Sequence, residues 1–214
     1  VDTGFDLNHS RKVSFGFQAT PVKPEPAGWR NWRICYKPAM PWNTVIWFTE
    51  WTELFNYMDT ARLNSTKIDS LKRLQHAGKT VSPYAALTCV SPLSPEYKYY
   101  GGEWEKHPLP WNRILSDSSL DPQNRTWAHN MICMNSSSYR DFYIWKLNHT
   151  VTQLNLEGLY FDWAVPYMCN NEEHGCGYRD DSGVLHPTFS VLGARELAKR
   201  IYSILKQNVY SPKS

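Results

Sequence analysis

Residues 158–164 read Gly158-Leu-Tyr-Phe-Asp-Trp-Ala164, and this stretch decides the fold class. A glycine followed by β-favouring apolar residues predicts a short buried strand that ends at the carboxylate of Asp162. Because burying a charge without a partner is costly, Asp162 needs hydrogen bonds, a cation or a catalytic role. Parallel α/β enzymes build their sites in this way, from side chains at the carboxyl ends of strands. We therefore expect Asp162 to lie at the centre of a functional site.

Strand and helix patterns alternate on either side of this segment. The predicted strands are 43–49, 79–89 and 127–134, and the predicted helices are 65–78, 138–154 and 191–207. The long excursions of the chain follow strands, which is typical of parallel (β/α) folds. Because a complete eight-fold barrel needs roughly 250 residues, we predict an α/β, TIM-barrel-like fold made of a partial barrel of about four βα units. A complete small α/β sheet is the alternative.

The first 28 residues differ in pattern from the rest of the chain. Residues 12–20 alternate like a half-exposed strand, and three prolines follow them between positions 21 and 26. We predict that residues 1–28 are the end of a β-sandwich domain with its linker. Residues 29–214 are then the N-terminal half of a (β/α)-barrel domain of the catalytic type. Since the first residue is Val1 and not methionine, we expect a processed chain or a fragment of a longer protein.

The composition excludes several classes of partner. With 214 residues, of which 42% are hydrophobic and 20% charged, the chain resembles an ordinary globular protein. The net charge of +3 is small and the basic residues are dispersed, so we expect no nucleic-acid partner. No apolar run approaches the roughly 18 residues of a membrane span, so we expect no membrane partner. The sequence has no nucleotide-binding glycine motif, and we expect no cofactor; the oligomeric state stays open.

Aromatic residues are unusually frequent, with ten tryptophans and thirteen tyrosines. Flat rings can stack on the apolar faces of sugars, while an aromatic-rich core is the alternative for any one of them. We predict a carbohydrate substrate. The predicted substrate-binding side chains are Trp51, Trp104, Tyr160, Trp163, Asn135 and His174.

Acidic side chains lie where hydrolysis of a glycosidic bond would need them. This reaction uses two carboxyl groups, one on each side of the bond that breaks. Asp162 is the first of them, because it ends a strand. The candidates for the second are Glu50, Glu172, Glu173 and Asp180, of which Glu50 and Glu173 are the predicted catalytic partners. A helix cap or a surface ion pair is the structural alternative for each acid.

The five cysteines, at positions 35, 89, 133, 169 and 176, are too few for a disulfide scaffold in a chain of this length. Cys169 and Cys176 are close enough to form a disulfide across the loop, and this is the favoured prediction. The alternatives are free thiols and a zinc site that joins Cys169, His174 and Cys176 to Cys133 or Cys89. Because the Cys-x6-Cys spacing is not that of a standard zinc finger, no metal ligand is assigned.

Five Asn-x-Ser/Thr motifs begin at positions 8, 64, 124, 135 and 148. Motifs of this kind accept N-linked glycans in exported proteins. We therefore predict a secreted or periplasmic glycoprotein.

Two segments resemble a known family. Residues 158–202 contain Gly158-Leu-Tyr-Phe-Asp-Trp-Ala164, His174-Gly-Cys-Gly-Tyr178, His186-Pro-Thr188 and Arg195-Glu-Leu-Ala-Lys-Arg-Ile-Tyr202. Residues 15–24 read Phe15-Gly-Phe-Gln-Ala-Thr-Pro-Val-Lys-Pro24. Together they resemble glycoside-hydrolase-like proteins related to family 123, the β-N-acetylgalactosaminidases, at the join between a sandwich domain and a barrel. With the region 47–51, the resemblance covers about half of the chain.

The resemblance implies a (β/α)-barrel that acts on glycans, a hydrolase of O-glycosyl bonds. It also implies substrate-assisted chemistry, in which an adjacent Asp-Glu pair orients and protonates while the N-acetyl group of the substrate attacks. The sequence departs from this pattern, because Trp163 follows Asp162 and the adjacent acid pairs are 172–173 and 180–181. Two other functions remain open. One is a non-catalytic carbohydrate-binding module using exposed aromatic rings, including Trp111, and the other is a zinc-dependent hydrolase built on Cys169, His174 and Cys176.

Overall fold

The structure is a computed structural model. It describes Arg30 and residues 34–35, 44–47, 65–90, 94–108, 113–115 and 127–210. By its contacts the chain divides into two units, residues 1–31 and 32–214, and the architecture below is that of the second unit. The prediction that residues 1–28 end a β-sandwich domain lies outside the described residues.

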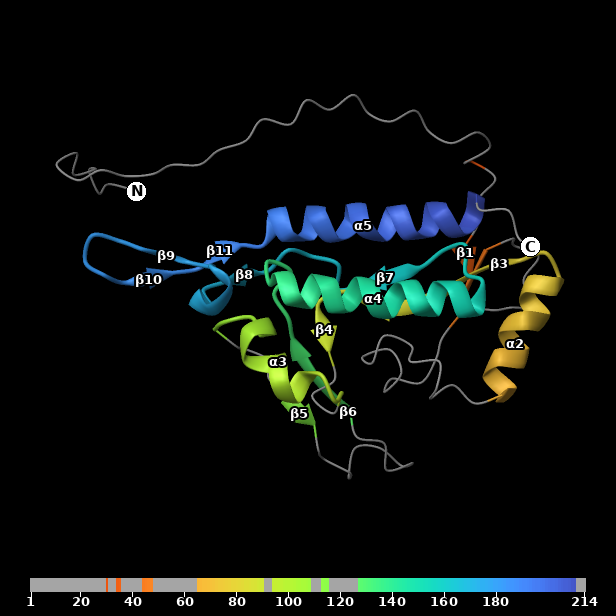
Figure 1. Ribbon diagram of the computed structural model, residues 1–214, viewed down its shortest axis with the longest axis horizontal. Coiled ribbons are helices and arrows are strands. Elements are labelled where there is room, and N and C mark those ends of the chain that lie inside the picture. The colour runs from red at the N-terminus through yellow and green to blue at the C-terminus, as the bar shows by residue number, and fades with distance from the viewer. Residues whose placement is uncertain are drawn as a thin grey trace. The chain divides into compact units, whose positions relative to one another are not determined.

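This unit contains a parallel sheet of four strands, of which β1 and β3 are labelled beside α2 in Figure 1. Its strands, in spatial order, are β1 (Ile34–Cys35), β2 (Thr44–Trp47), β3 (Thr80–Ala86) and β7 (Tyr160–Asp162). Each neighbouring pair is parallel. Helix α2 (Ser65–His76) connects β2 to β3, and helix α4 (Ser137–Leu154) lies between β3 and β7 in the chain. The α/β class with a parallel sheet is therefore confirmed, while the partial barrel stays a prediction.

One predicted strand belongs to a different sheet. Strand β6 (Trp127–Met131) pairs antiparallel with β4 (Cys89–Val90) and β5 (Arg113–Leu115). The prediction that residues 127–134 form the third parallel strand was wrong. The apolar pattern of such a segment indicates a strand but not its partner or direction, and here the pairing with residues 40 positions earlier decides both.

The three long helices follow the predicted segments. Helix α2 ends before Gly78, whose φ of 73° suits the turn into β3. Helix α4 begins one residue earlier than predicted, because the hydroxyl of Ser136 accepts the backbone N–H of Tyr139 and caps the helix. Helix α5 (Val191–Tyr210) runs to three residues beyond the predicted end. A shorter helix, α3 (Tyr97–Trp104), lies outside the predicted helices.

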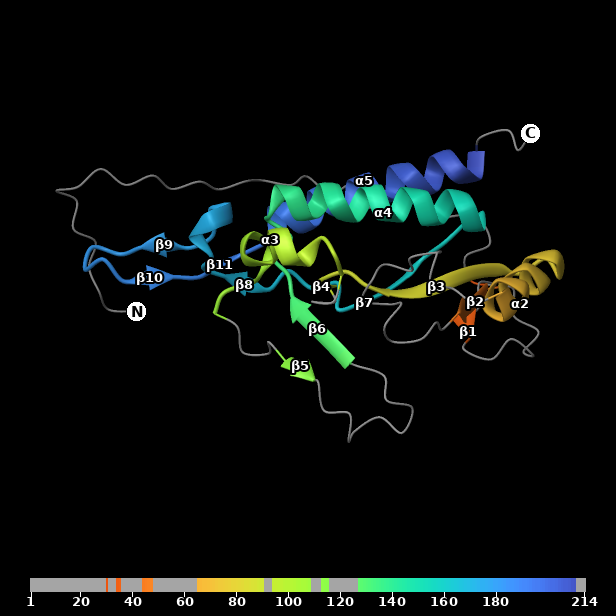
Figure 2. The ribbon, with the colours of Figure 1, turned by 60° about the horizontal axis from the view of Figure 1, so that its bottom comes forward.

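Helices α4 and α5 lie side by side along the sheet (Figures 1 and 2). Arg200 of α5 donates to the carboxylate of Asp141 on α4 over 2.6 Å. The main core forms where these helices meet the strands and α2. Its buried apolar residues include Val81, Leu87, Leu147, Val151, Leu197 and Ile201. Because one face of each helix is buried here, the sheet and both helices form a single packed unit.

The loop between β7 and α5, residues 163–190, has its own short elements. These are β8 (Met168–Cys169), the 3₁₀ helix η3 (Glu172–His174), β9 (Tyr178–Arg179), β10 (Leu185–His186) and β11 (Thr188–Phe189). Strands β9 and β10 pair antiparallel, and so do β8 and β11. The loop is therefore a folded excursion. Within the described residues, no helix is long and apolar enough to cross a membrane.

Candidate active site

Asp162 is the last residue of β7, at the carboxyl edge of the parallel sheet. It pairs in register with Ala86, the last residue of β3. The chain then turns sharply, because Trp163 has a φ of 53°, in the left-handed region that a bulky residue seldom adopts. The Thr88 hydroxyl donates to the carbonyl oxygen of Trp163 over 2.7 Å and holds this turn. The half-buried Asp162 thus lies beside the end of β3 and the residues that follow it.

Both carboxylate oxygens of Asp162 accept hydrogen bonds. The Tyr84 hydroxyl donates to Oδ2 in a short contact, and the Trp163 backbone N–H donates to Oδ1 over 2.8 Å. Tyr84 lies on β3, where it pairs in register with Tyr160 of β7. A carboxyl group that only accepts is arranged as a carboxylate and not as a proton donor. No local sequence signal marks Tyr84 as a partner of Asp162, because the pairing that brings them together joins residues 78 positions apart.

Aromatic rings surround this carboxylate. The rings of Tyr84 and Tyr160 stack with centroids 5.5 Å apart, and the Trp163 side chain is 39% exposed. Tyr167 packs against the buried Ala86, Cys89 and Met131. Burial raises the pKa of Tyr167, and the negative charge of Asp162 adds to the rise. A half-exposed acid with flat rings beside it suits a ligand that has both polar groups and apolar faces.

The other predicted site residues have different outcomes. Glu50, predicted to be catalytic, and Trp51, predicted to bind substrate, lie outside the described residues. Trp104 is only 1% exposed, and its ring stacks on Phe142 with centroids 4.8 Å apart. Its indole N–H donates to Ser138 over 2.9 Å. This corrects the prediction for Trp104, which is a core residue with no open ring face for a sugar.

The acids of the 163–190 loop take part in local contacts. Glu172 forms an ion pair with Arg179 over 2.7 Å. Asp180 accepts hydrogen bonds from Ser182, and its other oxygen lies 2.7 Å from Nε2 of His186. These contacts, the one with Ser182 first, lower the pKa of Asp180 below its usual range. Glu173 is exposed at the start of η3. Glu172 and Asp180 therefore serve the fold of the loop.

A second group of reactive side chains lies at the base of this loop. Cys133 follows β6, Cys169 ends β8, His174 ends η3, and Cys176 follows Gly175, whose φ is 75°. One ligating atom from each of the four residues lies within 4.8 Å of the others. The predicted disulfide between Cys169 and Cys176 is not formed, and both are free thiols. Of the two cysteines that the sequence offered as a fourth member of this group, the structure brings in Cys133 and not Cys89.

The charges of this group depend on one another. Hydrogen bonds from Cys133 and Cys176 lower the pKa of Cys169. The hydrogen bond between Cys133 and Cys169 also raises the pKa of Cys133. Burial alone would lower the pKa of His174, but its contacts with Cys169 and Cys176 raise it to about 10. A negative charge on Cys169 is therefore favoured, shared among the surrounding donors.

Asn135, predicted to bind substrate, has its side chain in this group instead. Its Nδ2 donates to the sulfur of Cys176 over 3.2 Å, and its Oδ1 accepts the backbone N–H of Gly193 over 3.1 Å. The amide nitrogen that a glycan would modify thus contacts a group of the protein itself, while substrate binding and glycosylation at Asn135 stay predictions. His174, also predicted to bind substrate, faces Cys169.

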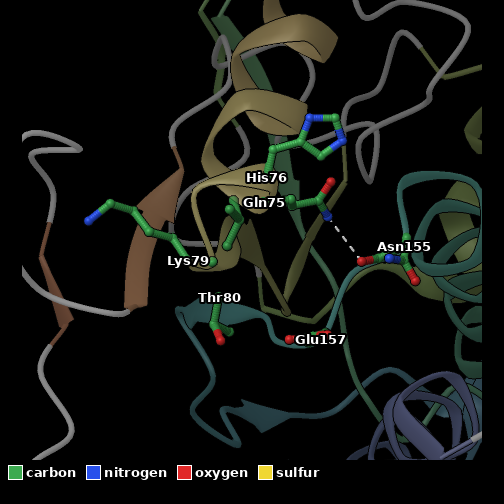
Figure 3. A pocket seen from close by; sticks show the side chains of 8 residues that line it. Gln75, His76, Lys79, Thr80, Asn155 and Glu157 are labelled. Carbon is green, nitrogen blue, oxygen red and sulfur yellow. Dashed lines mark hydrogen bonds between the residues drawn. The ribbon is translucent and has the colours of Figure 1, made fainter.

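A pocket lies at the opposite, amino-terminal edge of the sheet (Figure 3). It is lined by the end of α2, the start of β3 and the residues before β7. Figure 3 shows Gln75 reaching toward Asn155, and its amide donates to the carbonyl oxygens of Leu154 and Asn155 over 3.0 Å each. Active sites of parallel α/β folds lie at the carboxyl ends of strands, so this pocket is structural and the Asp162 edge is the candidate active site.

Neither a protein-family model nor a curated protein sequence matches the chain. Among solved structures it is similar to the α-galactosidase TtGalA from Thermus thermophilus in complex with stachyose, with a TM-score of 0.45 and 10% identity. It is also similar to the glycoside hydrolase domain of PelA from Pseudomonas aeruginosa, with a TM-score of 0.36 and 13% identity. The alignments cover 80% and 78% of this chain but only 33% and 54% of those chains. These neighbours are glycoside hydrolases, and scores this low assign neither a common fold nor an activity.

Proposed function

We propose that this protein is a carboxylate-dependent hydrolase of glycosidic bonds in which Asp162 is the central carboxylate. The observation that carries the proposal is the setting of Asp162 at the end of β7. The carboxylate is half-buried, hydrogen-bonded through both oxygens, and followed by the exposed ring of Trp163. An acid at this edge of a parallel sheet is in the position where such folds carry out chemistry.

The hydrogen bonds of Asp162 favour one of the two roles that carboxyl groups take in glycoside hydrolysis. A group whose oxygens both accept hydrogen bonds suits the ionised partner, which acts as nucleophile or base. As nucleophile, Asp162 would form a bond to the anomeric carbon while a second acid gives its proton to the leaving oxygen. A water molecule would then attack the anomeric carbon of the glycosyl ester, lose one of its protons to the second acid, and release the Asp162 carboxylate. The Tyr84 hydroxyl would hold the carboxylate in position.

Glu50 is our proposed proton donor. It follows strand β2 by three residues in the sequence, and the parallel strands β2, β3 and β7 all have their carboxyl ends at the same edge. Glu173 is the other proposed partner. The substrate-assisted chemistry of family 123 needs an acid next to Asp162, where this chain has Trp163, so we propose that the carboxylate itself attacks or activates water.

Trp163, Tyr160 and Tyr167 are the proposed sugar-binding residues. Aromatic rings bury apolar area at a small cost in side-chain entropy, and they leave the sugar hydroxyls free for polar contacts. Rings of this kind near a carboxylate support a pyranoside as the substrate class.

The test is turnover of a panel of oligosaccharides and aryl glycosides by the wild type and by Asp162→Asn. We expect kcat/KM on the responsive substrate to fall by about 10³-fold, equivalent to roughly 4 kcal/mol of transition-state stabilisation. The Tm is expected to stay within about 2 °C, since the amide keeps the shape of the side chain. Asp69→Asn, on the exposed face of α2, is the matched control and should leave both quantities unchanged.

Two results would contradict the proposal. Asp162→Asn that hydrolyses the substrate at the wild-type rate would remove the carboxylate from the mechanism. Glycan binding without any product from the wild type would favour a carbohydrate-binding module. In that case Trp163→Ala would weaken binding and Asp162→Asn would not.

A further inference from the structure

We propose that Cys133, Cys169, His174 and Cys176 bind one zinc ion in a closed structural site. Their three sulfur atoms and one imidazole nitrogen lie within 4.8 Å of one another. The three cysteines are buried and His174 is half-buried. Three thiolates and one imidazole are a standard ligand set for zinc, which prefers four ligands in a tetrahedron.

Two distances between the ligand atoms match those of a tetrahedral zinc site. With Zn–S bonds of about 2.3 Å, two sulfurs of a tetrahedral site lie about 3.8 Å apart. The sulfurs of Cys133 and Cys176 are 3.7 Å apart. With a Zn–N bond of about 2.0 Å, the sulfur-to-nitrogen distance is about 3.5 Å, and 3.3 Å separates Cys169 from Nε2 of His174. A disulfide would need sulfurs about 2.05 Å apart.

The orientation of His174 is that of a metal ligand. Its Nδ1 lies 2.6 Å from the backbone carbonyl oxygen of Glu103. Because a carbonyl oxygen only accepts, Nδ1 carries a hydrogen, and the proton on Nε2, which faces the sulfur atoms, is the one that zinc would displace. Histidines that bind metals usually place their second nitrogen on a carbonyl or carboxylate in this way.

Each sulfur has an N–H donor directed at it. The backbone N–H groups of His107 and Asn171 each lie 3.4 Å from Cys169. The backbone N–H of Asn135 lies 3.5 Å from Cys133, and its side-chain amide lies 3.2 Å from Cys176. Donors of this kind stabilise thiolates more than neutral thiols, which supports the charged form that a metal needs.

A closed site of four protein ligands has no open position for water or substrate, so its role is structural and not catalytic. Cys133 belongs to the end of β6, and the other three ligands belong to the loop that follows Asp162. The ion would therefore link this loop to the segment that contains Cys133. Asn171 marks the same junction, since its side chain donates to the carbonyl oxygens of Gly102 and Glu105 at the end of α3.

The first experiment measures metal content and thiols in the full chain purified under reducing conditions. Elemental analysis should find one zinc ion per chain, and Co²⁺ added to metal-free protein should give the visible bands and thiolate charge-transfer absorption of a tetrahedral cobalt–thiolate site. If the reduced protein binds neither Zn²⁺ nor Co²⁺, the proposal is wrong. A disulfide between two of the three cysteines in the native protein, with no metal bound, would also overturn it.

The second experiment compares Cys133→Ser with Cys89→Ser. Both cysteines are buried, but Cys89 contacts Met131, 3.6 Å away from its sulfur, and is not part of the group. Cys133→Ser should reduce bound zinc to background while Cys89→Ser keeps the wild-type amount. Equal zinc in the two variants would contradict the site.

A variant that restores a ligand keeps the test decisive if Cys133→Ser fails to fold. His174→Ala should lose zinc, and His174→Cys should regain it, because four thiolates also form a tetrahedral site. Zinc retained by His174→Ala at wild-type affinity, measured against a chromogenic chelator, would show that the imidazole is not a ligand. None of these measurements depends on hydrolytic activity.

Discussion

The Asp162 site and the group of three cysteines with His174 differ in how the fold builds them. Asp162 is half-buried at a strand end, and its partners are Tyr84 of the neighbouring strand β3 and the next residue in the chain, Trp163. The cysteine group is buried and joins residues 43 positions apart, with each ligand already directed at the others. The first arrangement leaves an acid accessible to a ligand, and the second leaves no access. The difference separates a position for chemistry from a position for stability.

Removal of the metal is the test of this difference for which we expect the largest effect. Chelation of zinc should lower the Tm of the wild type by roughly 10 °C, the equivalent of about 3–5 kcal/mol for a chain of this size. Asp162→Asn should show the same drop on chelation, because its metal site is intact. Differential scanning calorimetry with and without chelator measures both. A wild-type Tm that chelator leaves unchanged would contradict the stabilising role of the ion.

Tyr84→Phe tests the Asp162 side of the comparison. Loss of the hydroxyl removes a hydrogen bond to a charged group, worth about 1.5–3 kcal/mol, so kcat/KM should fall by roughly 10- to 100-fold. Bound zinc should stay at the wild-type level. Steady-state kinetics and metal analysis measure the two outcomes. Tyr99→Phe, on the exposed face of α3, should change neither, and an unchanged rate in Tyr84→Phe would remove the hydroxyl from the site.

Two variants of Trp163 distinguish the contribution of its ring to ligand binding from the backbone strain at this position. Trp163→Ala should raise KM by about 3- to 10-fold through loss of ring stacking. Since the φ of Trp163 is 53°, Trp163→Gly should be about 1 kcal/mol more stable than Trp163→Ala, with a similar KM. Chemical denaturation and kinetics check these values. Trp145→Ala, on the exposed side of α4, is the control for ring removal, and equal stability of the two Trp163 variants would argue against strain.

The smallest effect is expected at Asp180, in the turn between β9 and β10. The pKa of its carboxyl is lowered, so its contribution to the turn is complete above the ordinary aspartate pKa of about 4 and is lost as pH falls through the lowered value. Hydrogen exchange at Ser182 and Val184, whose N–H groups donate to Asp180, should therefore show no added opening between pH 7 and pH 5. Asp180→Asn should speed this exchange a few-fold while zinc and activity stay unchanged.

The sequence predicted the helices well and the strand partners less well. Residues 65–78 carried the apolar spacing, the polar start and the final glycine of α2, all of which are local signals. Residues 127–134 carried an apolar run that suits a strand in either type of sheet. Only the pairing of β6 with β4 and β5 placed it in the antiparallel sheet.

The same contrast between local signals and long-range contacts applies to the site residues. The position of Asp162 at a strand end follows from residues 158–164 alone, because the change from apolar residues to a carboxylate is local. The burial of Trp104 does not follow from its neighbours in sequence, since its environment comes from α4. Nor does the contact between Tyr84 and Asp162, which depends on the parallel register of β3 and β7.

By itself, the sequence determined the α/β pattern, the helix boundaries to within a few residues, and the strand that ends at Asp162. Periodicity, capping residues and glycine positions act over a few residues, so they can be read along the chain. Only the tertiary structure decided that Cys133 joins Cys169, His174 and Cys176 and that Tyr84 holds Asp162. Both depend on contacts between segments far apart in sequence, and packing of the whole unit is what brings those segments together.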